Sequence, residues 1–300
     1  MRSDGRPVAD ETAVSAGAGV IDHYRLLSLP VQIMSEDEWF ARAMRWYLEP
    51  FRRPVADRES VLLEVRAEGN DRGDGQLVYL RNGAEEMRGS RMGVLHHAVW
   101  DVHRIVPTWS RDFLFIHAGS VAHGGRALLL PGAPGGGKTT LVTALLRRGF
   151  DYLSDELGAI DPVSGDAYPF PKRLSLEPDA LTFFPGLAER LGDIAASGIA
   201  LGKRYVRPED LDARTGAAAP VRLIVFLGPQ RPGRPESVPL TRAETVARLA
   251  ASALNLYRYR ERGVVLLSRV ASRATAYELS GGDPNALADA VAELLDGPAE

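Results

Sequence analysis

The middle of the chain contains a glycine-rich segment with the residue types and spacing that phosphate binding requires. It matches G-x-x-x-x-G-K-[ST] without a mismatch, through Gly132, Ala133, Pro134, Gly135, Gly136, Gly137, Lys138 and Thr139, and Thr140 follows directly. Glycines let successive backbone N–H groups turn toward phosphate oxygens, and a helix that begins near Lys138 adds its positive end. Lys138 then reaches the β- and γ-phosphates, and the Thr139 hydroxyl can bind Mg²⁺. This P-loop, residues 132–139, therefore predicts a site for a nucleoside triphosphate and Mg²⁺.

An acidic pair follows the expected helix of the P-loop. It is formed by Asp155 and Glu156 in the segment Leu153-Ser154-Asp155-Glu156. A strand parallel to the strand before the P-loop, and reached through the helix, would end beside the loop and place both acids near the γ-phosphate. Two carboxylates there can divide the work, because one accepts a proton from an attacking hydroxyl while the other helps to hold Mg²⁺. Solvated acids at the end of a strand are the alternative.

Three features together carry a resemblance to a known family: His117 in the strand before the P-loop, the P-loop itself, and the acidic pair after its helix. With them, residues 113–160 resemble the catalytic core of HPr kinase/phosphorylase and its relatives, the HPr-kinase-like serine kinases. That core is related to ATP-dependent phosphoenolpyruvate carboxykinase. The resemblance implies ATP and Mg²⁺ as cofactors, Asp155 as the catalytic base and His117 near the transferred phosphate. It also implies that Thr139, Asp155 and Glu156 handle the metal ion.

The resemblance further implies the acceptor and the assembly. HPr-kinase-like kinases phosphorylate serine or threonine hydroxyls, and several accompany peptide-modification gene clusters, so a peptide or small protein such as a ribosomally made precursor peptide is the expected substrate. These kinases also form homo-oligomers. The chain departs from the family at Thr140, where HPr kinases carry glutamate, and over residues 1–108, which show nothing of their N-terminal domain. HPr itself is therefore not the expected substrate.

Three alternatives to a peptide kinase stay open at this point. An NTPase would transfer the phosphoryl group to water, and a nucleotide-sensing module would bind a peptide without any turnover. A kinase of a free alcohol such as serine would share the same chemistry with a smaller acceptor.

Lysine is rare in this chain, and its positions are informative. Of 36 basic residues only Lys138, Lys172 and Lys203 are lysines, and all of them lie between His117 and Arg207. A phosphoryl-transfer transition state needs cations on its equatorial oxygens, often from a mobile loop. We therefore expect Lys138, Lys203, Arg204 and Arg207 to act in catalysis, and Lys172 and Arg173 to contact the phosphate or an acidic substrate. A solvated basic face is the alternative for the residues outside the P-loop.

The elements that must position these residues follow from the hydrophobic periodicity. Around the P-loop we expect strands over 113–119 and 126–132, a helix over 141–149 and a strand over 150–154. Beyond them we expect a hairpin over 158–170, a loop over 196–212, a strand over 222–228, helices over 242–254 and 284–296, and a last strand over 274–280. Asp283 is expected to cap the last helix. These patterns predict an α/β fold over residues 109–300, and the resemblance specifies it as a P-loop kinase core of the HPr kinase/phosphoenolpyruvate carboxykinase type, a mixed sheet with flanking helices.

Residues 21–108 are expected to form a small α+β unit that could bind substrate, and residues 1–20 a disordered tail. A capping box at Ser35 and Glu38 predicts a helix that ends at Pro50, and strands are expected over 60–68 and 75–83 with a turn at Asn82-Gly83. The aromatic residues of the helix are expected in the core. His96, His97 and His103 lie on an amphipathic stretch without a carboxylate at a recognised spacing, so we expect packing residues there, not metal ligands.

The overall composition excludes several classes of protein. The chain of 300 residues is 45% hydrophobic and 25% charged with a net charge of −3, which disfavours a nucleic-acid-binding or membrane-surface protein. It has no cysteine, so a disulfide framework and a thiol nucleophile are excluded. The apolar runs are too short for a membrane span, and the first twenty residues lack the apolar core of a signal peptide. A cytoplasmic protein is the resulting expectation.

Overall fold

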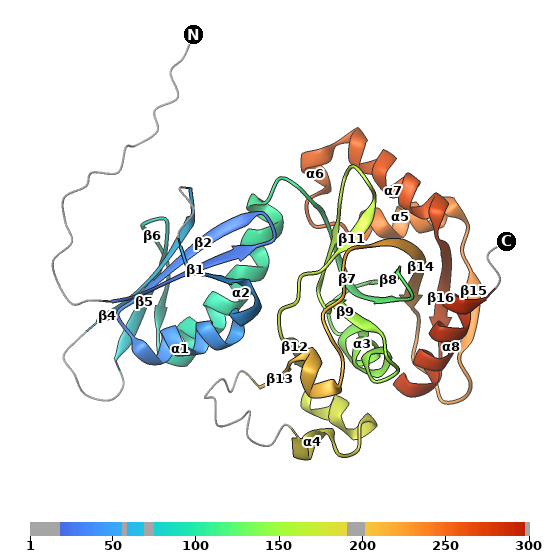
Figure 1. The fold of residues 1–300 in the computed structure, drawn as a ribbon, viewed down its shortest axis with the longest axis horizontal. Coiled ribbons are helices and arrows are strands. Elements are labelled where there is room, and N and C mark those ends of the chain that lie inside the picture. The colour runs from blue at the N-terminus through green and yellow to red at the C-terminus, as the bar shows by residue number, and fades with distance from the viewer. Residues whose placement is uncertain (1–18, 56–58, 69–74, 191–201, 298–300) are drawn as a thin grey trace, which may run out of the picture.

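The computed structural model of the chain describes residues 19–55, 59–68, 75–190 and 202–297. Two sheets organise these residues (Figure 1). The N-terminal unit, coloured blue to cyan, is built on one sheet, and the C-terminal unit, coloured green to red, is built on the other. The expected disordered tail, up to residue 18, lies outside the described residues.

The N-terminal unit contains a six-stranded sheet with the strand order β3-β1-β2-β4-β5-β6. Its neighbours are antiparallel except β2 and β4, which run parallel. Buried and half-buried residues alternate along β2 and through the first half of β4, as expected of a sheet with helices on one face. The strands are β1 (Val20–Leu26), β2 (Leu29–Ser35), β3 (Arg52–Arg53), β4 (Val61–Glu68), β5 (Gln76–Arg81) and β6 (Ala84–Gly89).

Two helices, α1 (Glu38–Tyr47) and α2 (Arg91–Trp109), pack against this sheet and against each other. The expected helix start at Ser35 is wrong. Asp37 is the N-cap and accepts a hydrogen bond from the Phe40 N–H at 2.8 Å, while the Ser35 hydroxyl donates to the backbone carbonyl of Asp37. The chain beyond α1 turns through a short 3₁₀ helix, η1 (Glu49–Phe51).

The two strands expected in this unit are confirmed as β4 and β5, and the expected turn joins β5 to β6. Asn82 and Gly83 both have positive φ angles, +49° and +80°, as a two-residue hairpin turn with the right-handed strand twist requires. The sequence analysis missed the hairpin of β1 and β2 and the length of α2. The unit is therefore an α+β structure with more strands than its periodicity indicated.

The C-terminal unit is built on an eight-stranded mixed sheet. The strand order is β11-β10-β7-β8-β14-β16-β15, and β9 pairs with β7. β14 runs parallel to β8 and to β16, and the other pairings are antiparallel. β11 also pairs with β14, so β7, β8, β14, β11 and β10 form a closed ring of pairings. The strands are β7 (Leu114–His123), β8 (Arg126–Pro131), β9 (Asp151–Ser154), β10 (Leu157–Ile160), β11 (Asp166–Tyr168), β14 (Ala219–Leu227), β15 (Glu236–Pro239) and β16 (Thr275–Ser280).

Helices cover both faces of the sheet around β8. Leu128 and Leu130 share one apolar cluster with α3 and α8, whereas Ala127 and Leu129 share another with α5 and α7. The uninterrupted apolar run of β8 follows from this arrangement, because successive side chains point to opposite covered faces. The helices are α3 (Lys138–Leu146), α5 (Arg242–Ser252), α6 (Leu256–Tyr259), α7 (Glu261–Arg273) and α8 (Pro284–Asp296).

The α/β architecture with a mixed sheet and flanking helices is confirmed. Every strand and helix expected between residues 113 and 170 and after residue 222 is present, and Asp283 caps α8 as expected. The expected loop over 196–212 is wrong where it is described, because residues 204–206 form β13 (Arg204–Val206), which pairs with β12 (Leu174–Leu176). The short helices η2 (Pro178–Phe183), α4 (Leu187–Arg190) and η4 (Pro208–Leu211) surround this small sheet. Within the described ranges, no helix has both the length and the apolar composition of a membrane crossing.

The two units share a hydrophobic core. The apolar cluster of the N-terminal unit also contains five residues of the C-terminal unit: Phe115, Leu157, Ala159, Phe170 and Tyr205. Tyr205 contacts the ring of Tyr47 on α1 edge to face, with ring centroids 5.5 Å apart. Burial of these rings fixes the position of α1 relative to the C-terminal sheet.

The helix after the P-loop lies very close to the sheet, and this contact depends on a glycine. A Cβ added at Gly119 of β7 would approach Cγ2 of the buried Val142 on α3 to 2.9 Å. We expect Gly119→Ala to lower the free energy of unfolding by about 1–3 kcal/mol, because the well-packed helix must move. Urea unfolding measures the change. Gly75→Ala is the control, since a Cβ there meets nothing closer than 4.0 Å; equal losses in the two variants would contradict the prediction.

Candidate active site

The P-loop joins β8 to α3 and has the conformation that its glycines allow. Gly135 and Gly137 have φ angles of +76° and +82°, in the left-handed region, and Gly137 is the N-cap of α3. The Lys138 ammonium group lies inside the curve of the loop and donates to the carbonyl oxygens of Gly132 and Ala133 at 2.9 and 2.7 Å. Burial lowers the pKa of Lys138, while Glu156 and Asp155 act in the opposite direction.

The expected contact between the acidic pair and the P-loop is present. β9 runs in the same direction as β8, although β7 lies between the two strands. At the end of β9, the Thr139 hydroxyl donates to Asp155 Oδ2 at 3.2 Å. A P-loop hydroxyl that gives its proton to a carboxylate keeps oxygen lone pairs for a cation. The pair Thr139 and Asp155 can therefore serve a Mg²⁺ ion together.

All the acceptor positions of the buried Asp155 carboxylate are in use. Oδ1 accepts from the Tyr152 hydroxyl at 2.9 Å and from Lys172 Nζ at 2.7 Å. Oδ2 accepts from the Ser175 backbone N–H at 3.1 Å as well as from Thr139. Both partners of the Lys172–Asp155 ion pair are at most 2% exposed. Burial acts to lower the pKa of Lys172, but Asp155 and Glu156 outweigh it and raise the pKa, so Lys172 is charged.

Glu156 differs from its neighbour because its side chain is 34% exposed. His103 Nδ1 lies 3.1 Å and Lys172 Nζ 3.5 Å from Glu156 Oε2. Burial acts to raise the pKa of Glu156, but His103, Lys172 and His117 outweigh it and hold the pKa well below the usual range. Glu156 is therefore an ionised carboxylate with access to solvent.

The P-loop and the acidic pair line one cavity of about 180 Å³, here called the acidic cavity. His117 enters it from β7; burial and the Lys138 charge lower the pKa of His117, so the imidazole is neutral at pH 7. Lys203 lies at the cavity and pairs with Glu177 at 3.1 Å. Its lining residues are His117, Pro134, Gly135, Gly137, Lys138, Thr139, Thr140, Asp155, Glu156, Ser175, Glu177 and Lys203.

Four basic residues lie elsewhere than their predicted role requires. Lys172 is buried under the cavity and binds Asp155, so it holds a protein carboxylate where a substrate contact was expected. Arg173 donates from Nε to the Trp46 carbonyl oxygen at 2.7 Å and stacks on the Trp46 ring. The exposed Arg207 pairs with Asp210 at 2.8 Å, and the exposed Arg204 lies on β13 outside the acidic cavity. Of the expected cations, Lys138 and Lys203 reach the cavity.

Among the site residues that the sequence analysis missed, two belong to the N-terminal unit. His103 on α2 was expected to be a packing residue, but it contacts Glu156, and its Nε2 lies 2.7 Å from the Tyr47 hydroxyl. By contrast, His97 packs against the rings of Tyr79 and Trp100, as expected. No local signal distinguishes the two histidines, because the contact that matters joins α2 to the segment after β9.

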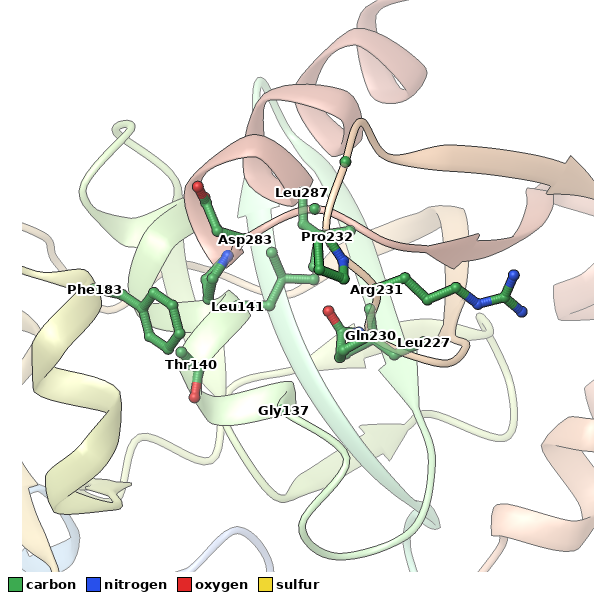
Figure 2. A pocket seen from close by; sticks show the side chains of 13 residues that line it. Gly137, Thr140, Leu141, Phe183, Leu227, Gln230, Arg231, Pro232, Asp283 and Leu287 are labelled. Atoms are coloured by element: carbon green, nitrogen blue, oxygen red, sulfur yellow. The ribbon is translucent and has the colours of Figure 1, made fainter.

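A second cavity of about 530 Å³ adjoins the P-loop, here called the apolar cavity (Figure 2). It lies between the first turn of α3, the loop after β14 and the start of α8, and it shares Gly137 and Thr140 with the acidic cavity. Figure 2 shows the Phe183 ring beside Thr140, with Leu141 and Leu287 deeper between the elements. Backbone hydrogen bonds from Gly281 to Pro229 and from Gly282 to Arg231 hold its wall together. An apolar cavity that continues from a phosphate-type loop fits a nucleoside.

The donor set of the two cavities fits a Mg²⁺-bound nucleoside triphosphate. Backbone N–H groups, Lys138 and the helix start suit phosphate oxygens, and the oxygens of Thr139 and Glu156 are the ligand type that Mg²⁺ prefers, while Asp155 holds the Thr139 hydroxyl. Among the described residues, no three His, Asp or Glu side chains cluster to hold a metal ion by themselves.

The buried ion pair under the acidic cavity predicts a large effect on stability. We expect Lys172→Met to lower the free energy of unfolding by about 3–5 kcal/mol, because the Asp155 carboxylate loses its charged partner in a buried environment. Lys203→Met is the matched control: its pair with Glu177 is partly exposed, so the expected change is below about 1 kcal/mol. Urea unfolding measures the free energy of unfolding of both variants. Similar losses in the two would contradict the prediction that the buried pair contributes more to stability than the exposed pair.

The geometry places a P-loop, a fixed carboxylate, an accessible carboxylate and a neutral histidine around one cavity, with an apolar cavity beside it. These are the parts that phosphoryl transfer needs. Comparison of the chain with protein-family models and with curated proteins gave no match. Its function is therefore argued from the site itself.

Proposed function

We propose that this protein is a Mg²⁺- and ATP-dependent phosphotransferase of the HPr-kinase-like type, which transfers the γ-phosphoryl group to a hydroxyl. One observation carries the proposal: the Thr139 hydroxyl of a complete P-loop binds Asp155 at 3.2 Å, and the ionised Glu156 faces the same cavity. A nucleotide-binding module without chemistry needs the P-loop but has no need for a second, accessible carboxylate beside it.

The two cavities indicate the orientation in which the nucleotide binds. The triphosphate occupies the acidic cavity, where Lys138 exchanges the carbonyl oxygens of its own loop for phosphate oxygens. The nucleoside occupies the apolar cavity, which is reached past Gly137 and Thr140. The γ-phosphate then lies toward Asp155, Glu156 and His117, at the far side of the P-loop from Phe183.

The contacts of the acidic pair favour a different division of labour from the one that the resemblance implied. Asp155 accepts from four hydrogen-bond donors, one of them the charged Lys172, so it serves as the fixed carboxylate that orients Thr139 and the Mg²⁺ site. Glu156 is accessible and ionised, so it is the carboxylate that orients the acceptor hydroxyl. Bound Mg²⁺ would neutralise negative charge that develops on the phosphates.

The step is an in-line displacement at the γ-phosphorus. The acceptor oxygen forms a bond to phosphorus, the bond to the β–γ bridging oxygen breaks, and ADP leaves with that electron pair. The hydroxyl proton passes to Glu156, late in a loose transition state in which the acceptor has become acidic. Lys138 stabilises charge on the transferring group, the neutral His117 can donate or accept one hydrogen bond there, and Lys203 lies at the cavity as a further cation.

The acceptor that we propose is a serine or threonine hydroxyl in a peptide or small protein, with a precursor peptide as one example. The same chemistry would serve free serine, and water would be the acceptor if the protein were an NTPase. A homo-oligomeric assembly belongs to the same proposal, since it follows from the resemblance of residues 113–160 to HPr-kinase-like kinases, and a cytoplasmic location is proposed from the composition of the chain.

The division of labour between the two acids can be tested directly. We expect Glu156→Gln to lower kcat about 10²–10⁴-fold, because the acceptor loses its base, while ATP binding stays near the wild-type value. Asp155→Asn is expected instead to raise the Mg²⁺ concentration required for binding and turnover. γ-Labelled ATP with free serine, peptides and small-protein fractions as acceptors measures both variants. A fully active Glu156→Gln variant would exclude Glu156 as the base. Label that appears only in inorganic phosphate would favour the NTPase.

The placement of the nucleoside predicts a separate effect at the apolar cavity. Phe183 is 42% exposed and lies beside Thr140, where its ring can cover a nucleotide base (Figure 2). We expect Phe183→Ala to weaken ATP binding about tenfold through the lost stacking, with no change for inorganic tripolyphosphate, which lacks a base. Calorimetric titration with both ligands measures this. Val163→Ala, on a distant exposed loop, is the control, and equal weakening of both ligands would place the base elsewhere.

A further inference from the structure

The N-terminal unit contributes a hydrogen-bonded chain that ends at the accessible carboxylate of the site. Tyr47 on α1 lies 2.7 Å from His103 Nε2 on α2, and His103 Nδ1 lies 3.1 Å from Glu156 Oε2. Tyr47 is fully buried and the His103 side chain is 16% exposed, so both groups are held by their surroundings. Glu156 thus has a partner from outside the unit that carries the P-loop.

The chemistry of the three groups is compatible with one continuous set of hydrogen bonds from Tyr47 through His103 to Glu156. Burial raises the pKa of Tyr47 well above its usual value, so its hydroxyl keeps its proton and donates to Nε2 of His103. Nδ1 then carries a hydrogen and donates to the Glu156 carboxylate. Such a chain sets the orientation of the imidazole ring, and the ring in turn sets the orientation of the carboxylate.

Other contacts keep α1, which carries Tyr47, in place against the C-terminal unit. Arg173 donates to the Trp46 carbonyl oxygen at 2.7 Å, and its guanidinium lies 3.9 Å from the centre of the Trp46 ring. The neighbouring Tyr47 contacts the Tyr205 ring from β13. The Tyr47 hydroxyl that contacts His103 is therefore held by the shared core.

We propose that His103 is a positioning residue for phosphoryl transfer, through which the N-terminal unit completes the active site. It holds the Glu156 carboxylate toward the acceptor side of the acidic cavity, where Lys172 alone would draw it down toward Asp155. This inference rests on the proposed function, and it assigns to residues 91–109 a role beyond packing or substrate capture. His103 does not touch the nucleotide or the acceptor; it acts through Glu156.

The test uses the full-length protein with Mg²⁺ and γ-labelled ATP, and it counts phosphoester and inorganic phosphate together so that any acceptor is registered. We expect His103→Leu to lower kcat about 10–100-fold, with the KM for ATP unchanged, because the nucleotide contacts remain. His103→Asn is expected to recover most of the loss, since its amide nitrogen stands close to the place of Nδ1 and can donate to Glu156. His96→Leu, at an exposed position of the same helix, is the matched control and should be as active as the wild type.

A double variant separates positioning from a general structural effect. In the Glu156→Gln background, adding His103→Leu is expected to cause little further loss, because the group that His103 positions has already been changed. Wild-type kcat in His103→Leu, a folded His103→Asn that is no better than His103→Leu, or fully additive losses would each overturn the inference. A wild-type protein that binds Mg²⁺ and ATP but releases no labelled product would instead overturn the proposed function, and His103 positioning with it.

Discussion

The buried ion pair between Lys172 and Asp155 is the interaction on which the rest of the site depends. A carboxylate in this position, under a P-loop and almost out of contact with water, would be costly without a charged partner. Lys172 supplies that partner, and the hydroxyls of Tyr152 and Thr139 and the Ser175 amide complete the set. Because every oxygen position of Asp155 is in use, the acid is rigid and Glu156, the next residue, is directed into the cavity.

The second determinant is the N-terminal unit, which forms part of the site and also packs against the C-terminal unit. His103 and Tyr47 extend from this unit toward Glu156, while Arg173 of the C-terminal unit contacts Trp46. The acidic pair is therefore held by contacts from both units. Lys172 of the C-terminal unit pairs with Asp155 and lies close to Glu156, and His103 of the N-terminal unit contacts Glu156. The apolar cavity, in contrast, is formed entirely by the C-terminal unit, between α3, α8 and the loop after β14.

The sequence predicts those parts of the site that are encoded locally. The P-loop, β7, β8, α3 and the turn at Asp283 follow from short motifs and hydrophobic periodicity, and the meeting of Asp155 with Thr139 follows from a single crossover through α3. The site residues whose contacts could not be predicted are those that depend on segments far apart in the sequence. Lys172 and Arg173 have the composition of a substrate-binding patch, but tertiary burial uses one to neutralise Asp155 and the other to hold α1. The sequence does not distinguish His103 from His97, because both histidines lie on the same helix, α2. They differ in their tertiary contacts, since His103 contacts Glu156 whereas His97 packs against the Tyr79 ring.

The shared core has a consequence for how such a protein can change its specificity. The apolar cluster of the N-terminal unit also contains Phe115, Leu157, Ala159, Phe170 and Tyr205 of the C-terminal unit. Because of this packing, neither unit can be exchanged as a module without leaving the other with an exposed apolar surface. Recombination between related chains at the end of α2 would break this packing. If the proposed function holds, new acceptors are therefore expected to be acquired by single substitutions around the rim of the acidic cavity, while the shared core stays unchanged.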